Sequence, residues 1–145
     1  MTDVICVAAV ILTGGLFGGC GGGPAAPTAV DVSGTWDATF EGIVQGAGTT
    51  QTDDFTMELS QSGTTVSGSL RFSPNFDAID TPITAGRIDG SRLTYSAATS
   101  LGPGCEARVD AEVTVDPSGT RMEGSQTQST CEGTAVGQMM ATKRR

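Results

Sequence analysis

The sequence predicts an all-β domain in the form of an eight-stranded antiparallel up-and-down barrel. From Ser33 onward, apolar and polar residues alternate with a period of two, and the alternating runs are rich in threonine and valine. Glycine-containing turns separate these runs, and no apolar period typical of a helix extends over any length. A meander of eight strands can close into a barrel, which removes the exposed edge strands. The alternative architecture is an open β-sandwich.

The first 19 residues have the composition of an export signal. Nine consecutive apolar residues, Val4 to Leu12, are about half of the roughly 20 needed to cross a bilayer, and small residues follow them. The stretch Leu16-Phe17-Gly18-Gly19-Cys20 resembles the lipobox of bacterial lipoproteins. That resemblance implies that residues 1–19 are cleaved and that Cys20 becomes an acylated amino terminus. The alternative is an ordinary cleaved signal peptide that leaves Cys20 free.

Acyl chains on Cys20 would anchor the protein at the bacterial cell envelope, because each buried methylene contributes about 0.8 kcal/mol. In the lipoprotein family an Asp after the cysteine favours the inner membrane, whereas this chain has Gly21. The resemblance therefore implies an outer-membrane location, with the domain facing the periplasm or the cell surface.

Residues 20–32 are expected to form a flexible linker between the lipid and the barrel domain, residues 33–145. Gly21 to Thr28 is rich in glycine, alanine and proline, and we expect order to begin near Val30. Removing residues 1–19 leaves 126 residues, enough for one core. It also removes Asp3, which changes the net charge from −8 to −7. This acidic balance argues against binding nucleic acid or acidic lipid headgroups.

The turns repeat in a way that defines the hairpins. Gly63-Thr-Thr-Val66 is matched in type by Gly119-Thr-Arg-Met122, and in both the glycine can supply the positive φ of a tight turn. The apolar residue three positions later restarts the alternation. The predicted strands are 33–42, 54–62, 64–73, 82–89, 91–100, 106–116, 120–129 and 134–143.

Two of the four cysteines are expected to form a disulfide. Cys6 leaves with the signal and Cys20 takes the lipid, so Cys105 and Cys131 remain in an oxidising compartment. They lie equally far from Ser118, in the turn between the sixth and seventh strands, and should therefore meet at one end of the barrel. The sequence contains no histidine and no Cys-x-x-Cys spacing, which argues against a metal site.

The first strand begins with Ser33-Gly34-Thr35-Trp36, which resembles the Gly-x-Trp motif of the lipocalin and avidin-like barrels. The resemblance implies that Gly34 and Trp36 close one end of the barrel. It also implies that a basic residue of the last strand, Lys143 or Arg144, packs over the indole ring. It covers the architecture and implies no particular ligand.

The chain offers little catalytic chemistry. Without histidine there is no Ser-His or Cys-His pair, and the glycine-rich stretches do not precede helices as phosphate-binding loops do. Asp53 and Asp54 are adjacent on a strand and point to opposite faces. Asp77 and Asp80 provide too few oxygens for a calcium site. We therefore expect no enzymatic activity, no cofactor and no metal.

The candidate binding residues lie on the inward phase of the strands. Gln126 and Gln128 follow the inward phase of Met122 and Gly124, so they either face a ligand cavity or become solvated where a bulge shifts the phase. Tyr95, Phe55 and Met57 join them as candidate lumen contacts. Small inward residues either leave space for a ligand or fit a narrow barrel; they are Ala38, Gly68, Ala97, Ala107, Ala111 and Gly124.

These observations favour a non-enzymatic envelope lipoprotein whose barrel binds a small, largely apolar ligand. The alternative is a protein-binding module with an envelope protein as partner. Small disulfide-bearing barrels of this kind also resemble bacterial metalloprotease inhibitors, which would make Gly21–Val32 a segment that enters a protease cleft. A third possibility is a structural envelope component that acts through its outer face or loops.

Overall fold

The computed structural model describes residues 28–72 and 78–145. The expected signal (1–19), the lipidation site Cys20, most of the linker and Asp77 lie outside these residues. Within the described ranges, no helix is long and apolar enough to span a membrane.

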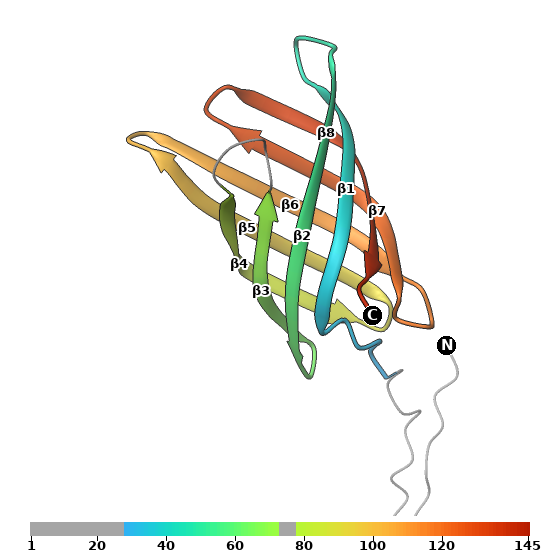
Figure 1. Ribbon diagram of the computed structural model, residues 1–145. Coiled ribbons are helices and arrows are strands. Elements are labelled where there is room, and N and C mark those ends of the chain that lie inside the picture. Colours follow the sequence, from blue (N-terminus) through green and yellow to red (C-terminus); the bar gives the residue numbers. More distant parts are fainter. Residues whose placement is uncertain (1–27, 73–77) are drawn as a thin grey trace, which may run out of the picture.

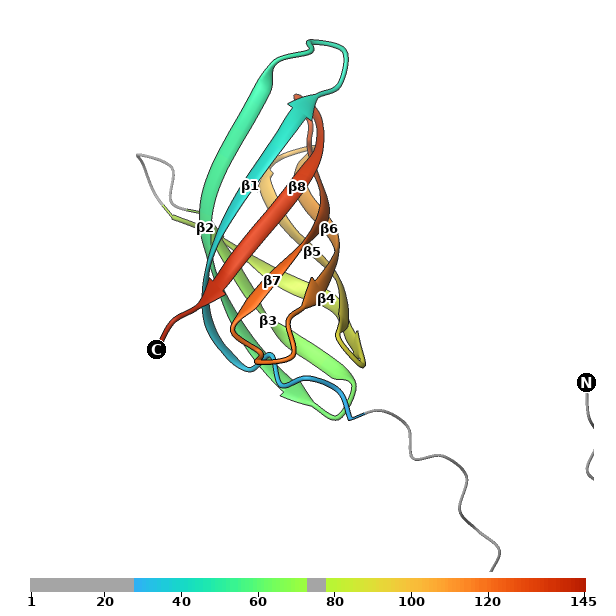
Figure 2. The same cartoon turned by 90° about the vertical axis from the view of Figure 1, so that its right-hand side faces the viewer.

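Eight antiparallel strands form a closed barrel in simple meander order (Figures 1 and 2). They are β1 (Gly34–Val44), β2 (Thr50–Ser62), β3 (Thr65–Phe72), β4 (Ile79–Asp89), β5 (Arg92–Gly102), β6 (Cys105–Val115), β7 (Arg121–Thr130) and β8 (Gly133–Lys143). Each strand pairs with the next, and β8 closes the barrel on β1, from Trp36 opposite Lys143 to Val44 opposite Ala135. The barrel is therefore confirmed over the open sandwich.

Two strands begin three or more residues earlier than the alternation predicted. β2 begins at Thr50 instead of residue 54, because Thr50 to Asp53 continue the pairing with β1. β4 begins at Ile79 instead of residue 82, because Ile79 pairs with Phe72 of β3. Both extensions lie toward the end of the barrel where the β1–β2 hairpin connects. They add inward-facing side chains at that end.

The opposite end of the barrel is closed by Trp36. Its indole is fully buried, and its Nε1 donates a hydrogen bond to the carbonyl of Val32 at 2.9 Å. The Lys143 ammonium lies 5.6 Å from the centre of the indole ring, as the Gly-x-Trp resemblance implied. Val30 and Val32, which the sequence analysis assigned to the linker, pack here; the Val30 N–H bonds to the Gly90 carbonyl. We call this the closed end.

The inward phase of the strands forms a continuous apolar core above the closed end. Its largest fully buried side chains are Trp36, Phe40, Met57, Leu70, Ile88, Leu93 and Met139. These buried side chains occupy the middle of the barrel, as in other narrow barrels whose interior is filled by side chains.

Glycines bring neighbouring strands close together. A Cβ at Gly68 would overlap the Glu58 carbonyl, and one at Gly124 would overlap the Glu112 carbonyl. A Cβ at Gly137 would likewise overlap the Glu41 carbonyl, where β8 pairs with β1. The small inward residues were expected either to leave space for a ligand or to fit a narrow barrel. The glycines support the narrow barrel, because the backbone of the neighbouring strand occupies the space that a side chain would need.

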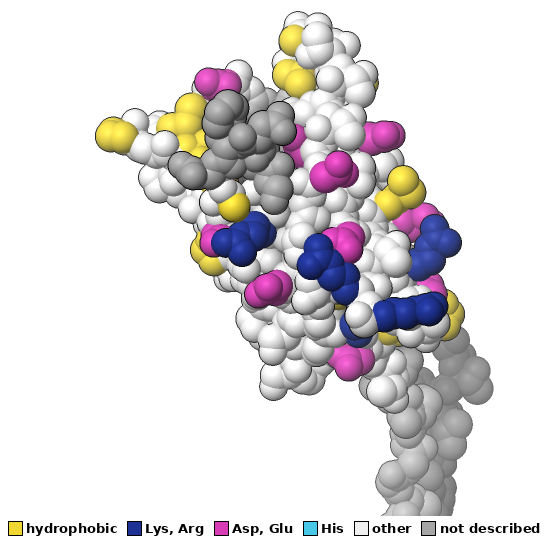
Figure 3. All heavy atoms as spheres, in the orientation of Figure 1, with side chains coloured by type: hydrophobic (Ala, Val, Ile, Leu, Met, Phe, Trp, Pro, Cys, Tyr) yellow, Lys and Arg dark blue, Asp and Glu magenta, His cyan; other side chains and the backbone are white. Residues whose placement is uncertain are grey.

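The outer surface carries mixed charge. On the face shown in Figure 3, basic side chains lie beside acidic ones. Exposed pairs between described residues are Arg71–Asp80, Arg92–Glu112, Arg108–Asp110 and Arg144–Asp37. Each is solvent-accessible and is expected to contribute little to stability.

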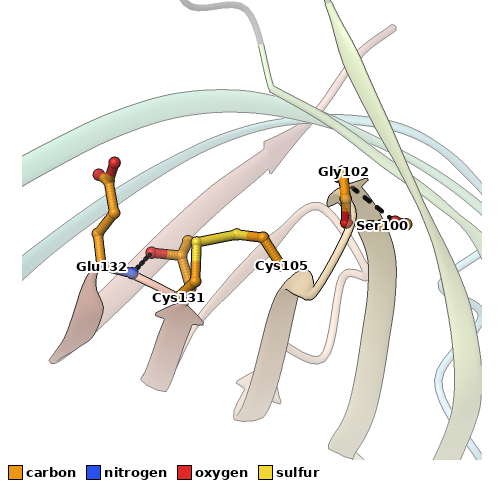
Figure 4. Close-up of a disulfide and its surroundings, with 6 residues drawn as sticks. Ser100, Gly102, Cys105, Cys131 and Glu132 are labelled. Atoms are coloured by element: carbon orange, nitrogen blue, oxygen red, sulfur yellow. Dashed lines mark hydrogen bonds between the residues drawn. A yellow bond between two sulfur atoms is a disulfide. The ribbon is translucent and has the colours of Figure 1, made fainter.

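The disulfide joins Cys105, at the start of β6, to Cys131, directly after β7 (Figure 4). The two Cα atoms are 5.2 Å apart. Both cysteines lie at the same end, as predicted from their equal distance to Ser118. This end is opposite the closed end, because β6 starts and β7 finishes there (Figure 1).

Candidate functional site

The barrel is hollow at the end opposite Trp36, where a cavity of about 410 Å³ opens between the strands. We call this cavity the mouth. The side chains that define it are Gln51, Asp53, Phe72, Ile79, Thr81, Leu101, Ala107, Val109 and Gln128. They come from six of the eight strands, so the mouth depends on the closed barrel and not on one hairpin.

A chain of polar side chains crosses the mouth from β2 to β7. The Gln51 amide donates to the Asp53 carboxylate at 2.5 Å and to the Gln128 side-chain oxygen at 3.1 Å. Asp53 and Gln51 face inward because they stand opposite Phe40 and Gly42 of β1. The neighbouring Asp54 faces outward and accepts a hydrogen bond from the Thr39 hydroxyl at 2.7 Å. The expectation that the two aspartates point to opposite faces is confirmed.

Asp53 has no basic partner among the described residues. All eight lysines and arginines of the chain lie within the described ranges, and none forms an ion pair with Asp53. Arg108 borders the mouth, but its guanidinium donates to Asp110 on the outer surface at 2.8 and 3.3 Å. These bonds from Arg108 lower the pKa of Asp110. The mouth therefore contains a half-buried carboxylate without a counter-ion.

Two further polar groups of the mouth have unused hydrogen-bonding capacity. The Thr81 hydroxyl is buried, with only 1% of the residue exposed, and has no partner in the described part of the chain. The Gln128 amide nitrogen is also buried and unpaired there. Buried polar groups nearly always have a partner, so each of these groups requires an explanation. A molecule in the mouth would supply one.

The remaining wall of the mouth is apolar. Phe72 stacks on Phe55 with ring centres 4.9 Å apart, which fixes the Phe72 ring at the edge of the cavity. Val109 and Ala107 line the opposite side, and Ile79 lies exposed at the rim. The mouth thus combines an apolar surface with a few polar groups, as small-molecule sites commonly do.

A second polar cluster lies deeper, within the apolar core. The Tyr95 hydroxyl donates to the Gln126 side-chain oxygen at 3.0 Å and lies 3.8 Å from the Met57 sulfur. The Gln126 residue is 1% exposed, and its amide nitrogen has no partner in the described part of the chain. Burial raises the pKa of Tyr95 far above its ordinary value, so the hydroxyl stays protonated. We call Tyr95, Gln126 and Met57 the polar layer.

The predicted lumen residues therefore divide into two groups. Pairing between β6 and β7 is continuous, with Gln128 opposite Val109 and Gln126 opposite Ala111, so both glutamines keep the inward phase. Only Gln128 lines the mouth. Gln126, Tyr95 and Met57 lie in the polar layer below, and Phe55 supports Phe72 from behind.

Sequence reasoning missed Gln51, Asp53 and Thr81. The first two share the phase of Phe55 and Met57, and extending that alternation backwards would have placed them in the lumen. No comparable signal identified Thr81, because β4 shifts register against both neighbours.

A broader groove of about 670 Å³ runs over the outside of β3 to β7. It is bordered mainly by serine and threonine side chains, and its two carboxylates, Asp110 and Glu112, already pair with arginines. Arg87 also borders this groove and forms no ion pair among the described residues. Within residues 28–72 and 78–145, no group of three or more His, Cys, Asp or Glu side chains could hold a metal ion.

No protein-family model matches the chain, and no curated protein is significantly similar to it in sequence. The all-β eight-stranded closed barrel with its Cys105–Cys131 disulfide is therefore supported by the sequence pattern and the structure, and not by a relative.

Proposed function

We propose that this protein is a non-enzymatic binding protein of the bacterial cell envelope that holds a small, largely apolar molecule in the mouth of its barrel. One observation carries the proposal: the buried Thr81 hydroxyl and the buried Gln128 amide nitrogen have no protein partner in the described chain, and both line a cavity. A ligand with an apolar body and a polar end would fill the cavity and satisfy these groups.

The size of the mouth limits the ligand. A volume of about 410 Å³ lies at the small end of the roughly 300–1,000 Å³ found for ligand pockets. The core below the polar layer is packed, so a long chain could not extend down the lumen as it could in a wider barrel. We therefore place the ligand in the mouth, between Phe72, Val109 and the polar side chains that cross it.

The envelope location rests on the lipobox resemblance of Leu16 to Cys20. The described chain enters the barrel at the closed end, where Val30 bonds to Gly90. Seven residues separate Cys20 from Thr28, and the eight Cα–Cα steps between these two residues can span at most about 29 Å when fully extended. A tether of this length would hold the closed end near the membrane and leave the mouth directed away from it.

The protease-inhibitor alternative receives less support. It requires the segment Gly21–Val32 to enter a partner's cleft, but Val32 is fully buried in this protein's own core. Its N–H also bonds to the Gln61 side chain at 2.9 Å. Releasing that part of the segment would expose the Trp36 indole, whose N–H bonds to Val32.

Two measurements test the proposal. Native mass spectrometry of the chain purified from envelope fractions should show a stoichiometric extra mass that disappears on denaturation. A bare native mass would count against a tightly held ligand. Separately, Cys20→Ser should move the protein from the membrane fraction to the soluble fraction. Cys6→Ser is the matched control, because Cys6 lies in the expected signal; an unchanged membrane association of Cys20→Ser would contradict the lipid anchor.

A further inference from the structure

The mouth contains one formal charge, and its sign indicates the chemistry of the ligand. Asp53 points into the cavity, is half-buried and accepts one described hydrogen bond, from Gln51. A carboxylate has about four acceptor positions, so most of its capacity faces the cavity. The other charged groups that border the mouth are turned away: Asp54 bonds to Thr39 on the outer face, and Arg108 bonds to Asp110.

The arrangement around Asp53 favours a ligand that donates hydrogen bonds and carries positive charge. The Gln51 amide donates one N–H to Asp53 and one to Gln128, but it carries no charge and therefore cannot neutralise the carboxylate. An ammonium group supplies a positive charge and up to three N–H donors, and hydrogen bonds between ionised groups are about twice as strong as neutral ones. A carboxylate ligand would be repelled by Asp53 and by the acidic chain as a whole.

The rest of the mouth favours an apolar body for the remainder of the ligand. Phe72 and Val109 provide the apolar wall, and the cavity of about 410 Å³ has room for a small molecule beside the polar groups. Buried Thr81, with its unpaired hydroxyl, is a second and independent indication that the site is completed by a bound molecule.

We infer that the mouth of the barrel selects a small amphipathic amine, whose ammonium group binds Asp53 and whose apolar body lies against Phe72 and Val109. This inference rests on the proposed function, since it names the ligand class of the same site. It makes Asp53 the specificity-determining residue of the site and Asp54, one position away, irrelevant to selection.

The test compares three probes with the same six-carbon body: n-hexylammonium, hexan-1-ol and hexanoate. Each is titrated into the oxidised full-length chain at neutral pH, where an alkylamine is protonated, and the amide shifts of Gln51, Asp53, Thr81 and Gln128 are followed by NMR. We expect hexylammonium to bind at least about tenfold more tightly than hexan-1-ol, as one charge-assisted hydrogen bond predicts. Hexanoate should bind most weakly.

The matched variants are Asp53→Asn and Asp54→Asn, which remove the same charge from adjacent residues. Asp53→Asn should abolish the preference for hexylammonium over hexan-1-ol and leave hexan-1-ol binding nearly unchanged. Asp54→Asn should retain the preference. If hexan-1-ol binds as tightly as hexylammonium, or if both variants lose the preference equally, the amine assignment is wrong while the mouth remains a binding site. If none of the three probes shifts the mouth amides, the proposed function itself fails.

Discussion

The polar layer makes a quantitative prediction about what fills the barrel below the mouth. Tyr95 and Gln126 form one buried hydrogen bond at 3.0 Å, and the Gln126 amide nitrogen has no partner among the described residues. If no water or ligand reaches this depth, the polar layer is anhydrous and forms the bottom of the mouth. Removing both polar groups together should then be tolerated, whereas removing one should not.

The expected magnitudes follow from the contacts. Tyr95→Phe deletes the only described donor to Gln126 and should lower the free energy of unfolding by about 1–3 kcal/mol, the cost of leaving a buried polar group unpaired. Gln126→Leu removes the amide nitrogen that has no described partner, but it leaves the buried Tyr95 hydroxyl with only the Met57 sulfur, so it should also lower the free energy of unfolding, by about 1 kcal/mol or more. In the double variant both groups become apolar with nearly the same shape. It should be at least as stable as wild type.

Urea unfolding measures all three variants, and the single tryptophan, Trp36, reports the transition because it is fully buried at the closed end. The double-mutant cycle isolates the coupling between Tyr95 and Gln126. A double variant that is less stable than wild type by more than about 1 kcal/mol would refute this reasoning. It would show that the Gln126 amide is satisfied by water or ligand and that the occupied space extends below the mouth.

Three further predictions concern the stability of the barrel that carries the site. Gly137→Ala should destabilise the protein by about 1–3 kcal/mol or more in urea unfolding, because the methyl group would overlap a β1 carbonyl at the closing seam; an unchanged midpoint would contradict this close contact. Replacing Cys105 and Cys131 together by alanine should lower the free energy of unfolding by about 3.5 kcal/mol, the value that the chain-entropy relation gives for a sequence separation of 26 residues. Guanidinium unfolding measures this loss, and a loss below about 1 kcal/mol would contradict the prediction. Hydrogen bonds from the Ser118 hydroxyl and from turn N–H groups lower the pKa of Asp116 to about 2, below its ordinary 3.8. The stabilisation from Asp116 should therefore be complete above pH 3.8 and be lost as the pH falls through about 2, and Asp116→Asn should flatten the acid unfolding profile in that window.

The parts of the fold that the sequence predicted well are those governed by strict periodicity. Side chains alternate faces along a strand, so Trp36 could be placed in the lumen without knowing any partner strand, whereas Gln126 and Gln128 could be placed there only if no bulge intervened. The disulfide followed from the cysteine count, and its position at one end of the barrel followed from the hairpin geometry around Ser118. These inferences need only local conformation and the symmetry of an antiparallel turn.

The parts that escaped prediction depend on pairing between strands. Thr50 to Asp53 is entirely polar, so no apolar alternation marks it, and it becomes strand only because β1 continues beside it. Thr81 lies where β4 shifts register against its neighbours, which local sequence does not reveal. The glycines appeared equally consistent with ligand space, because their role depends on how closely the next strand approaches.

If the mouth binds a small molecule, a side chain that fills the mouth should weaken the binding. Ala107 lines the cavity from β6, whereas Ala98 of β5 stands opposite Arg108 on the outward phase. Hexan-1-ol could bury about five methylenes at ~0.8 kcal/mol each, which corresponds to a dissociation constant on the order of 1 mM. NMR titration of the oxidised full-length chain should show this binding in wild type and Ala98→Phe, and at least about tenfold weaker binding in Ala107→Phe. Equal binding by both variants would contradict this expectation, because the probe would then occupy a site other than the mouth.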